Sequence, residues 1–414
     1  MKTQLDTLMQ TAHVDALLIV GSAQHNPAMQ YFTGEAHVTE ALLVKHRGEP
    51  PILFHYPMER GEAAQTGLRT TNMATYSSSE LLKEAGGDPL RASALRLGRI
   101  LHDAGVDAGT VAVYGVNEVG ATLAQIQTLG ELFPALKIQG FPNSMDPILA
   151  EAELTKDADE IAHIRRMGQV TTRVVAKTAE FLSGHSARDG VLRKPDGQPL
   201  LLGEVKRQIG LWLAEEDVEA PEGVIFSIGR DAGLPHSAGN PEDPMRLGQT
   251  IVFDIYPAEA GGGYFYDFTR TWCLGFAPDE VQAVYDQVLR VQQRIIAELE
   301  PDAPFQRYQE RTCELFEQDG HVTVRQKADV EEGYVHSIGH GLGLHVHERP
   351  FSGMSAGEGD RLAANTVFTV EPGLYYPSRG FGVRIEDTLW ARPDGTFEVL
   401  ADYPRELVLP VSGS

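Results

Sequence analysis

Short apolar runs separated by a helical pattern organise the first part of the chain. Four runs rich in Val, Ile, Leu and Tyr predict β-strands, at Ala16–Val20, Ala41–Lys45, Ile52–Tyr56 and Val111–Gly115. Between the third and fourth runs, apolar residues recur at three- and four-residue spacing from Leu90 onward, which predicts a helix. This order is typical of an α/β unit with a mixed sheet and a core of its own.

The pattern changes near residue 152. Two turn-forming prolines, Pro142 and Pro147, precede a long helix that we expect to begin near Asp157, where acidic residues fill the first turn. We therefore predict two domains, residues 1–152 and residues 153–414.

Apolar β-type segments dominate the second predicted domain, at 223–229, 250–257, 264–275, 366–377 and 380–391. Helical patterns near 278–299 and 304–319 interrupt them. Because strands and helices are grouped here and do not strictly alternate, an α+β fold fits this part better than a doubly wound sheet.

The charge balance excludes several classes of partner. The chain has 35 Lys and Arg against 58 Asp and Glu, a formal net charge of −23, whereas nucleic acids and anionic membranes require clustered cations. Cys273 and Cys313 are the only cysteines, which excludes a disulfide framework and a zinc site built on several thiolates. No signal-type or membrane-spanning apolar run occurs. We expect a cytoplasmic globular protein with no nucleic-acid or membrane partner.

Four carboxylates and one histidine stand in or beside the apolar segments of the second domain: Asp254, Asp267, His340, Glu371 and Glu386. A buried, unpaired carboxylate costs several kcal/mol or more, so each must be paired, protonated or bound to a metal. Arg270 and Arg384 could neutralise two of the four acids, and a surface position or an ion pair is the alternative for each acid alone. Together, this oxygen-rich set without a thiolate suits two divalent ions, Mn²⁺ first and Co²⁺ or Zn²⁺ as alternatives.

The segment from Tyr334 to Phe351 strengthens the metal hypothesis. Its glycines permit a close backbone approach to a site. The segment contains four histidines, His336, His340, His345 and His347, and three glycines, Gly339, Gly341 and Gly343.

Four motifs carry a resemblance to a known family: DIYPAEAGGGYFYDFTRTW, GHGLGLHVHE, VEPGLYY and RIEDT. They resemble the metallopeptidases of the pita-bread fold, which include methionine aminopeptidases, Xaa-Pro aminopeptidases and Xaa-Pro dipeptidases (prolidases). The resemblance covers residues of about 155 to 410. By position and strand pattern, the first domain resembles the creatinase-type domain that precedes the catalytic domain in the two Xaa-Pro branches.

The resemblance implies a role for each site residue. Asp267 and Glu386 would bridge two ions, Asp254 would complete one, and His340 with Glu371 would complete the other. Glu371 would also be the general base. Histidine donors to the oxyanion of the reaction would be His236, His347 and His336.

The resemblance also implies a substrate class, a small peptide with proline in second position. Such a bond lacks the N–H that ordinary proteases bind, whereas a site that holds the carbonyl and the free amine does not need it. Arg384 matches a family arginine that supports site and substrate, and Tyr375 is a candidate either for the pocket itself or for support of the residues that line it. Arg349 is a candidate for the terminal carboxylate of a dipeptide, with an ion pair as the equal alternative.

One feature departs from the family. Asp254 and Asp267 lie thirteen residues apart, about two more than usual, across a glycine-rich stretch that is typical of a hairpin turn. Whether both side chains share a face of the sheet therefore depends on the turn.

Several readings stay open. We favour an Xaa-Pro dipeptidase over an Xaa-Pro aminopeptidase, which would release the N-terminal residue from longer peptides. The long first domain disfavours a methionine aminopeptidase, the complete ligand set disfavours a metal-free creatinase, and a non-catalytic binding protein on the same fold is the remote alternative. The family resemblance also implies a homodimer.

Overall fold

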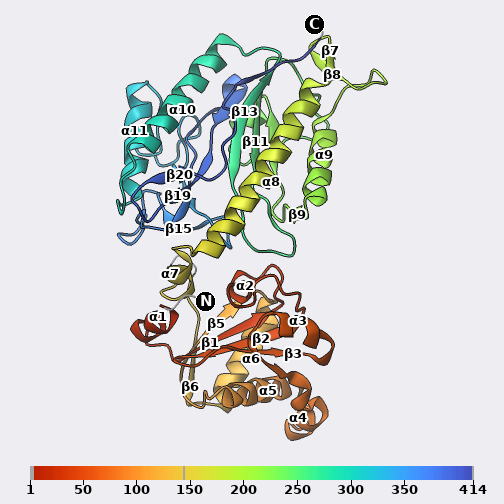
Figure 1. Ribbon diagram of the computed structural model, residues 1–414, viewed down its shortest axis with the longest axis vertical. Coiled ribbons are helices and arrows are strands. Elements are labelled where there is room, and N and C mark those ends of the chain that lie inside the picture. Colours follow the sequence, from red (N-terminus) through yellow and green to blue (C-terminus); the bar gives the residue numbers. More distant parts are fainter. Residues whose placement is uncertain (1–3, 143–144, 413–414) are drawn as a thin grey trace. The chain divides into compact units, whose positions relative to one another are not determined.

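The computed structural model describes residues 4–142 and 145–412, which form two compact units (Figure 1). Unit 1 comprises Met1–Glu153 with Gly261–Gly263, and unit 2 comprises Leu154–Ala260 with Tyr264–Ser414. Each unit contains its own hydrophobic clusters. None of the described helices has both the length and the apolarity that crossing a bilayer requires.

Unit 1 is built on a six-stranded mixed sheet in the order β4-β3-β2-β1-β5-β6. Its strands are β1 (Ala16–Gly21), β2 (Ala41–His46), β3 (Ile52–His55), β4 (Arg69–Asn72), β5 (Gly109–Gly115) and β6 (Leu136–Gln139). Its helices are α1 (Leu5–Thr11), α2 (Pro27–Thr33), α3 (Arg60–Gln65), α4 (Ser78–Glu84), α5 (Pro89–Asp103), α6 (Val119–Leu132) and α7 (Leu149–Glu153), with 3₁₀ turns at Pro57–Glu59 and Met73–Thr75.

All four predicted strands and the predicted helix of this unit are confirmed, whereas the two edge strands were missed. β4 has the polar sequence Arg-Thr-Thr-Asn and β6 is short, so neither shows an apolar run. Along β1, Leu18 belongs to one hydrophobic cluster while Leu17 and Ile19 belong to the other. Because alternate strand residues face opposite sides, both faces of this sheet are covered.

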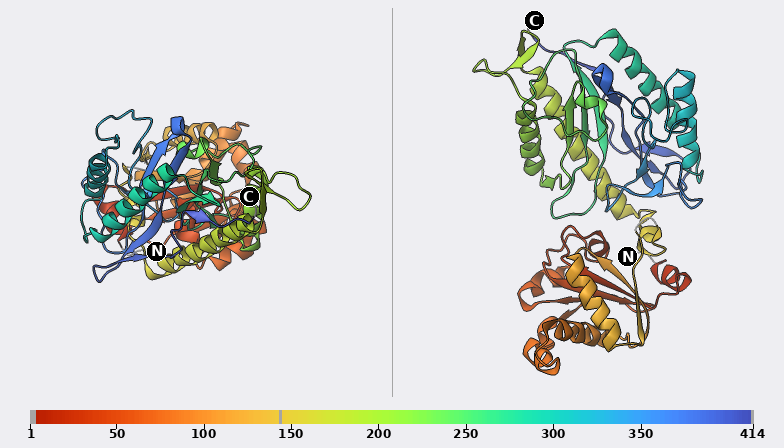
Figure 2. Two further views of the ribbon diagram at one scale, coloured as in Figure 1. Left: turned by 90° about the horizontal axis from the view of Figure 1, so that it is seen from above. Right: turned by 180° about the vertical axis from the view of Figure 1, so that it is seen from behind.

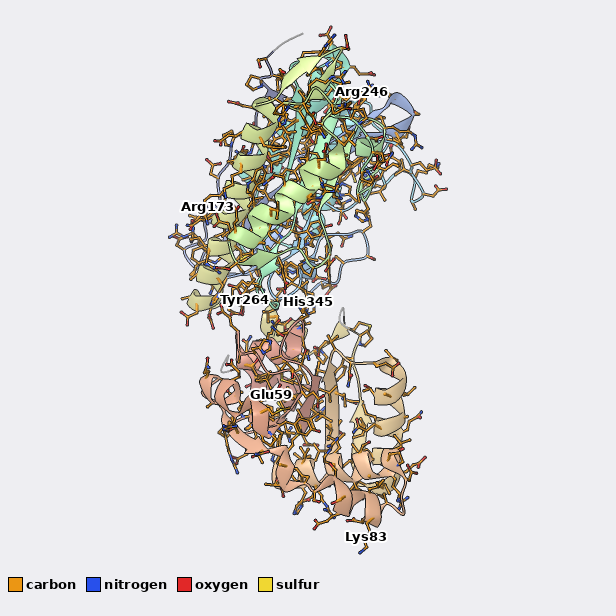
Figure 3. All side chains as sticks on the ribbon, turned by 90° about the vertical axis from the view of Figure 1, so that its right-hand side faces the viewer. Glu59, Lys83, Arg173, Arg246, Tyr264 and His345 are labelled. Atoms are coloured by element: carbon orange, nitrogen blue, oxygen red, sulfur yellow. The ribbon has the colours of Figure 1, made fainter. Side chains whose placement is uncertain are left out.

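Unit 2 opens with the long helix α8 (Ala158–Ser183), which the sequence predicted. Asp157 accepts a hydrogen bond from the Glu160 backbone N–H at 3.0 Å, and the Glu160 carboxylate accepts one from the Asp157 N–H at 2.7 Å. This reciprocal capping box fixes the start of the helix. Its inner face buries residues such as Ile164 and Met167, and its outer face carries exposed residues such as Arg173 (Figure 3).

Two main sheets follow in unit 2, in the orders β10-β11-β13-β21 and β15-β14-β16-β19-β20. Three small two-stranded sheets, β17-β18, β9-β12 and β7-β8, complete the unit. The strands are β7 (Ser186–Arg188), β8 (Val191–Arg193), β9 (Val218–Glu219), β10 (Ile225–Ile228), β11 (Thr250–Ile255), β12 (Ala258–Glu259), β13 (Phe268–Leu274), β14 (His340–Gly341), β15 (Glu348–Phe351), β16 (Val367–Val370), β17 (Gly373–Tyr376), β18 (Phe381–Arg384), β19 (Asp387–Ala391), β20 (Phe397–Val399) and β21 (Val408–Leu409). The remaining helices are α9 (Leu202–Glu215), α10 (Asp279–Ala297) and α11 (Gln306–Gln318), with 3₁₀ turns at Asp231–Gly233 and Pro377–Arg379.

Helices cover each sheet separately. One cluster joins α8 and α9 to the β10-β11-β13 sheet, and a second joins α10 and α11 to β16, β18 and β19, as both directions of view show (Figures 1 and 2). An isolated bridge between Thr269 and Glu386 connects β13 to the segment before β19. The predicted α+β character is confirmed, and this bridge brings the chemically dense segments of both sheets together.

Candidate active site

The hairpin of β11 and β13 places two acids on one face. Asp254 stands opposite Thr269 in the antiparallel register, and Asp267 precedes Thr269 by two residues. Since cross-strand partners and residues two apart share a face, the side chains of Asp254 and Asp267 lie on the same side of the sheet. The thirteen-residue spacing left open whether the two acids share a face of the sheet, and the structure shows that they do.

Glu386 joins these acids from the second sheet. Its backbone N–H donates to the Thr269 carbonyl at 3.1 Å. Its carboxylate accepts a hydrogen bond from the Thr269 hydroxyl at 2.7 Å. Only 1% of Glu386 is exposed. One threonine thus orients the carboxylate that the sequence assigned as bridging.

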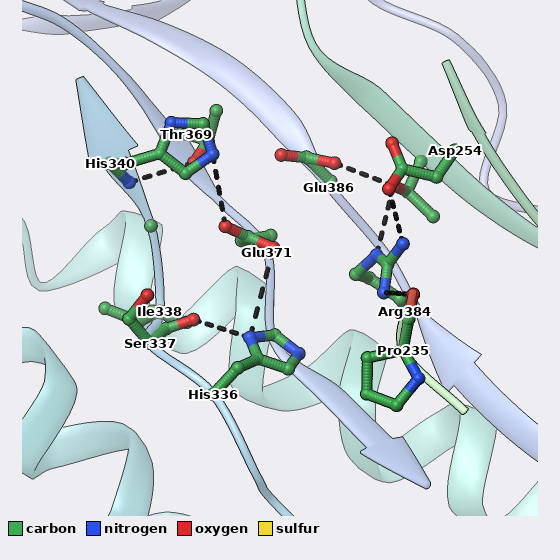
Figure 4. A network of polar contacts seen from close by, with 12 residues as sticks. Pro235, Asp254, His336, Ser337, Ile338, His340, Thr369, Glu371, Arg384 and Glu386 are labelled. Carbon is green, nitrogen blue, oxygen red and sulfur yellow. Dashed lines mark hydrogen bonds and ion pairs between the residues drawn. The ribbon is translucent and has the colours of Figure 1, made fainter. Parts of the chain in front are cut away.

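His340 and Glu371 complete the cluster. His340 Nε2 lies 3.6 Å from Asp267 Oδ2. It lies 3.4 Å from Glu371 Oε1 (Figure 4). His340 Nδ1 lies 3.0 Å from the Gly341 carbonyl and donates to it, so Nε2 is left as the atom that can bind a cation. Burial lowers the pKa of His340 to about 3, which keeps the ring neutral, as a metal ligand must be.

The arginines near the cluster neutralise only part of its negative charge. Arg384 forms an ion pair with Asp254, whereas Arg270 pairs with Asp387 at 2.9 Å and with no acid of the predicted set. Among the residues that the structure describes, no arginine forms an ion pair with Asp267, Glu371 or Glu386. The structure thus neutralises one of the four acids, not the two that sequence proximity allowed.

The carboxylates themselves show this imbalance. Burial, with repulsion from Asp254, raises the pKa of Asp267 well above its usual range, and burial, with repulsion from Asp267, does the same to Glu386. Burial raises the pKa of Glu371 to about 8. Three buried oxygens have no hydrogen-bond partner among the described residues: Asp254 Oδ1, Asp267 Oδ1 and Glu386 Oε1.

These features fit a divalent metal. Ligand atoms of Asp267, His340 and Glu386 lie within 4.8 Å of one another, and all three residues are buried. Orphaned carboxylate oxygens around a neutral imidazole are the donors that a hard or borderline cation requires. Bound cations would supply the positive charge that the arginines do not.

The three predicted histidine donors line the same cavity as the five predicted ligands. The His347 and His340 rings lie 4.2 Å apart between centroids. His336 Nδ1 lies 4.0 Å from Glu371 Oε2, and burial lowers the pKa of His336 to about 3. His236 is exposed in the loop after Asp231–Gly233. The three histidines therefore line the cavity beside the carboxylate cluster.

The cavity has a volume of about 780 Å³ and lies within unit 2. Small-molecule sites range from roughly 300 to 1,000 Å³, so a short peptide fits. Beyond the cluster, its wall is formed by the apolar residues Ile209, Leu213, Ala220, Val224, Tyr256 and Phe351, among others.

The three predicted substrate residues have different surroundings. Arg384 lines the cavity, and its guanidinium donates to the Tyr375 hydroxyl at 2.7 Å, which in turn lies 2.9 Å from His336 Nε2. Arg349 does not line the cavity, and its Nε donates to Asp360 at 2.9 Å. For Arg349 the structure favours the ion-pair alternative over a contact with substrate.

Sequence reasoning missed Thr269 and the cavity-lining Lys206. Thr269 could have been found from its place inside the motif DFTRTW, between Asp267 and Arg270. Lys206 gave no such signal, because a lysine on an amphipathic helix is typical of a solvated face.

Thr269 leads to a first prediction. Thr269→Val keeps the shape of the side chain and removes the hydroxyl that donates to Glu386. We expect metal affinity to fall by about 10–100-fold, the usual cost of losing a partner that orients a ligand. Titration calorimetry with Mn²⁺ measures this, and an affinity equal to that of the wild type would contradict the role.

Comparison with known proteins connects this site to a family. Residues 162–393 match metallopeptidase family M24. A probable dipeptidase PepE of Mycobacterium tuberculosis H37Rv is 30% identical over 267 residues, which is 64% of this chain and 63% of that protein. An Xaa-Pro dipeptidase of Lactobacillus delbrueckii subsp. lactis is 28% identical over 304 residues, 72% of this chain and 73% of that one.

Solved structures share the whole fold. A dipeptidase of Pyrococcus horikoshii OT3 superposes with a TM-score of 0.73 at 22% identity, covering 98% of both chains. An X-Pro aminopeptidase of Thermotoga maritima MSB8 gives 0.73 at 23% identity, covering 98% of this chain and 100% of that one. The predicted pita-bread fold is confirmed. Since the family match spans more than half of the chain and includes the whole carboxylate cluster, the protein belongs to metallopeptidase family M24, whose members are hydrolases that use divalent metals.

Proposed function

We propose that this protein hydrolyses the Xaa-Pro bond of dipeptides with two divalent ions, Mn²⁺ in the first place and Co²⁺ or Zn²⁺ as alternatives. The observation that carries the proposal is the buried cluster of Asp254, Asp267, His340, Glu371 and Glu386, in which three acids lack an arginine partner. The relatives add support, since a probable dipeptidase and an Xaa-Pro dipeptidase are among them.

In this proposal, five side chains would hold the two ions: Asp267 and Glu386 would be shared by both, Asp254 would serve one, and His340 with Glu371 would serve the other. When bound, such ions supply Lewis acidity toward the peptide carbonyl and a water of lowered pKa. Thr269 and Gly341 hold two of these ligands in orientation through the hydrogen bonds described above.

Glu371 is the proposed proton carrier. Its side chain is 15% exposed, against 7% for Asp267, and it lies between His340 and His336 (Figure 4). A carboxylate at the open side of the cluster reaches both the attacking water and the leaving amine, as a general base that later returns the proton must.

The histidines serve the developing negative charge. Burial lowers the pKa of His336 and of His347, so each ring is neutral and carries one N–H. In His336 this N–H is on Nδ1, which donates to the Ser337 carbonyl at 2.7 Å, so His336 would have to exchange that partner for the oxyanion. Together with His236 they line the cavity beside the cluster. Donors placed where charge develops stabilise a transition state more than a ground state.

The proposed substrate is one whose scissile bond has no N–H group, because the nitrogen of an Xaa-Pro bond belongs to the proline ring. An Xaa-Pro bond offers a carbonyl and, in a dipeptide, a free amine and a free carboxylate close together. The carboxylate cluster attracts the ammonium group of such a peptide. An Xaa-Pro aminopeptidase is the second candidate, because the fold is shared with an enzyme of that name.

Rates on Ala-Pro and Ala-Pro-Ala separate the two candidates. The protein is freed of metal with a chelator and reloaded with Mn²⁺, Co²⁺ or Zn²⁺ one at a time. We expect Ala-Pro to be cleaved with at least about a tenfold higher kcat/KM, a difference of about 1.4 kcal/mol. Equal or faster cleavage of Ala-Pro-Ala would favour the aminopeptidase, and no cleavage with any ion would refute both.

Metal removal also has an expected effect on stability. Repulsion among Asp254, Asp267, Glu371 and Glu386 destabilises the metal-free fold, and an ion that binds only the folded protein stabilises it. With Mn²⁺ at 100 times its Kd we expect about 2.7 kcal/mol of added stability. Thermal scans with and without Mn²⁺ measure this, and Mg²⁺ at the same ionic strength controls for screening.

A further inference from the structure

Lys206 on α9 lines the proposed active-site cavity. Its Nζ donates to the carbonyls of Val224 and Ala238, both at 2.9 Å. Val224 precedes β10, and Ala238 follows His236 by two residues. The ammonium is thus anchored by backbone between one wall of the cavity and the loop that carries His236.

The charge of Lys206 is not balanced. An ammonium has three N–H groups, and the two carbonyls satisfy two of them. Among the residues that the structure describes, no carboxylate lies within ion-pair distance of Nζ, although Glu222 also lines the cavity. Burial alone lowers the pKa of this half-buried lysine. A partly desolvated cation without an anion is unfavourable unless a ligand supplies the anion.

The other cations near the site are already engaged. Arg384 pairs with Asp254, and Arg349 pairs with Asp360 outside the cavity wall. Among the described residues that line the cavity, the cations are Lys206 and Arg384, and of these two Lys206 is the one that no acid pairs with.

We infer that Lys206 binds a carboxylate of the peptide substrate through its third N–H. This assignment rests on the proposed peptidase function and names the residue that would bind the anionic end of the substrate. Two sources share this chemistry, the C-terminal carboxylate of a dipeptide and an acidic side chain of its first residue. The terminal carboxylate fits better, because a dipeptide carries it next to the scissile bond, whereas an acidic side chain is present only in some substrates.

The test compares acids with their amides. Ala-Pro and Ala-Pro-NH₂ differ only in the terminal charge, and Glu-Pro-NH₂ and Gln-Pro-NH₂ differ only in the side-chain charge. Lys206→Met removes the ammonium and keeps the apolar stem, Lys206→Arg keeps the charge, and Arg207→Met is the control, because Arg207 is exposed on the same helix and does not line the cavity.

We expect Lys206→Met to lower kcat/KM for Ala-Pro by about 10–100-fold, mainly through KM, as loss of a charged hydrogen bond predicts. Ala-Pro-NH₂ should change less than about threefold, Lys206→Arg should recover part of the loss, and Arg207→Met should match the wild type. If Lys206→Met lowers kcat/KM for Glu-Pro-NH₂ but not for Gln-Pro-NH₂ or Ala-Pro, Lys206 binds the carboxylate of an acidic side chain and not the terminal one.

Equal losses on acid and amide would overturn the inference, since Lys206 would then only hold β10 and the His236 loop in place. No loss on any substrate would overturn it as well. If the wild type cleaves no proline peptide, the proposed function fails separately. Calorimetry of the Mn²⁺-loaded protein with Ala-Pro and Ala-Pro-NH₂ then tests the inference. The inference is supported if the wild type binds Ala-Pro more tightly than Ala-Pro-NH₂ and Lys206→Met loses this preference. Equal binding of the two peptides by the wild type refutes it.

Discussion

Asp267→Ala is expected to abolish peptidase activity, with kcat/KM reduced by far more than 100-fold, while the metal-free fold keeps its stability. Replacing a residue that only orients a metal ligand already lowers metal affinity or activity by about 10–100-fold, so replacing a proposed bridging ligand should lower them further. Asp267 is 5% exposed, contacts His340 and belongs to the buried set that lies within 4.8 Å.

The stability part of this prediction follows from the raised pKa of Asp267, which burial and Asp254 cause. A carboxyl whose pKa is higher in the folded state than in the unfolded chain contributes stability below its unfolded pKa, and that stability is lost as the pH rises through the folded pKa. At neutral pH the metal-free wild type therefore carries a penalty that Asp267→Ala removes, and its Tm should be equal or higher.

Calorimetry with Mn²⁺, hydrolysis of Ala-Pro and thermal scans at pH 5 and pH 8 measure these effects. Asp286→Ala, on the exposed face of α10, is the matched control and should leave all three unchanged. Undiminished turnover by Asp267→Ala would refute the proposed metal site. A large loss of stability in the metal-free variant would instead show that Asp267 stabilises the fold directly.

The sequence was sufficient to predict the cluster because its members lie in apolar segments where an unpaired charge is costly. It could not show which arginine serves which acid. Arg384 on β18, two residues before Glu386, pairs with Asp254 on β11, whereas Arg270, three residues after Asp267, pairs with Asp387. Such partners depend on which strands meet, here through the bridge between Thr269 and Glu386.

Residues outside the motifs were harder to predict. Lys206 has the helical position of an ordinary surface lysine, and only the packing of α9 against β10 brings it to the cavity. For Arg349, which stands in a histidine-rich motif, the sequence left a substrate contact and an ion pair equally open, and the structure shows the pair with Asp360. Proximity in sequence to catalytic motifs therefore indicates where a site lies more reliably than which side chains reach its substrate.

Arg270→Met is expected to destabilise the protein by about 3–5 kcal/mol, because it leaves several buried carbonyl oxygens without their donor and removes one of the two arginines, Arg270 and Arg405, that pair with Asp387. Arg270 and Asp387 are both 0% exposed. The Arg270 guanidinium donates to four backbone carbonyls as well as to Asp387, and it lies 4.1 Å from the centroid of the Phe268 ring. The carbonyl oxygens that accept from it belong to Thr269, Glu386, Tyr403 and Pro404.

The same variant should weaken metal binding. Arg270 joins the carbonyl of Glu386, a proposed metal ligand, to the carbonyl of Thr269, whose hydroxyl donates to the Glu386 carboxylate. Denaturant unfolding and Mn²⁺ calorimetry measure the two effects. Arg290→Met, which removes an exposed pair with Asp319, should cost less than about 1 kcal/mol. If Arg270→Met proves too unstable to purify, Arg270→Lys keeps the charge but not the planar fork, and it should still bind Mn²⁺ more weakly. Wild-type affinity in Arg270→Lys would show that the guanidinium stabilises the fold without positioning Glu386.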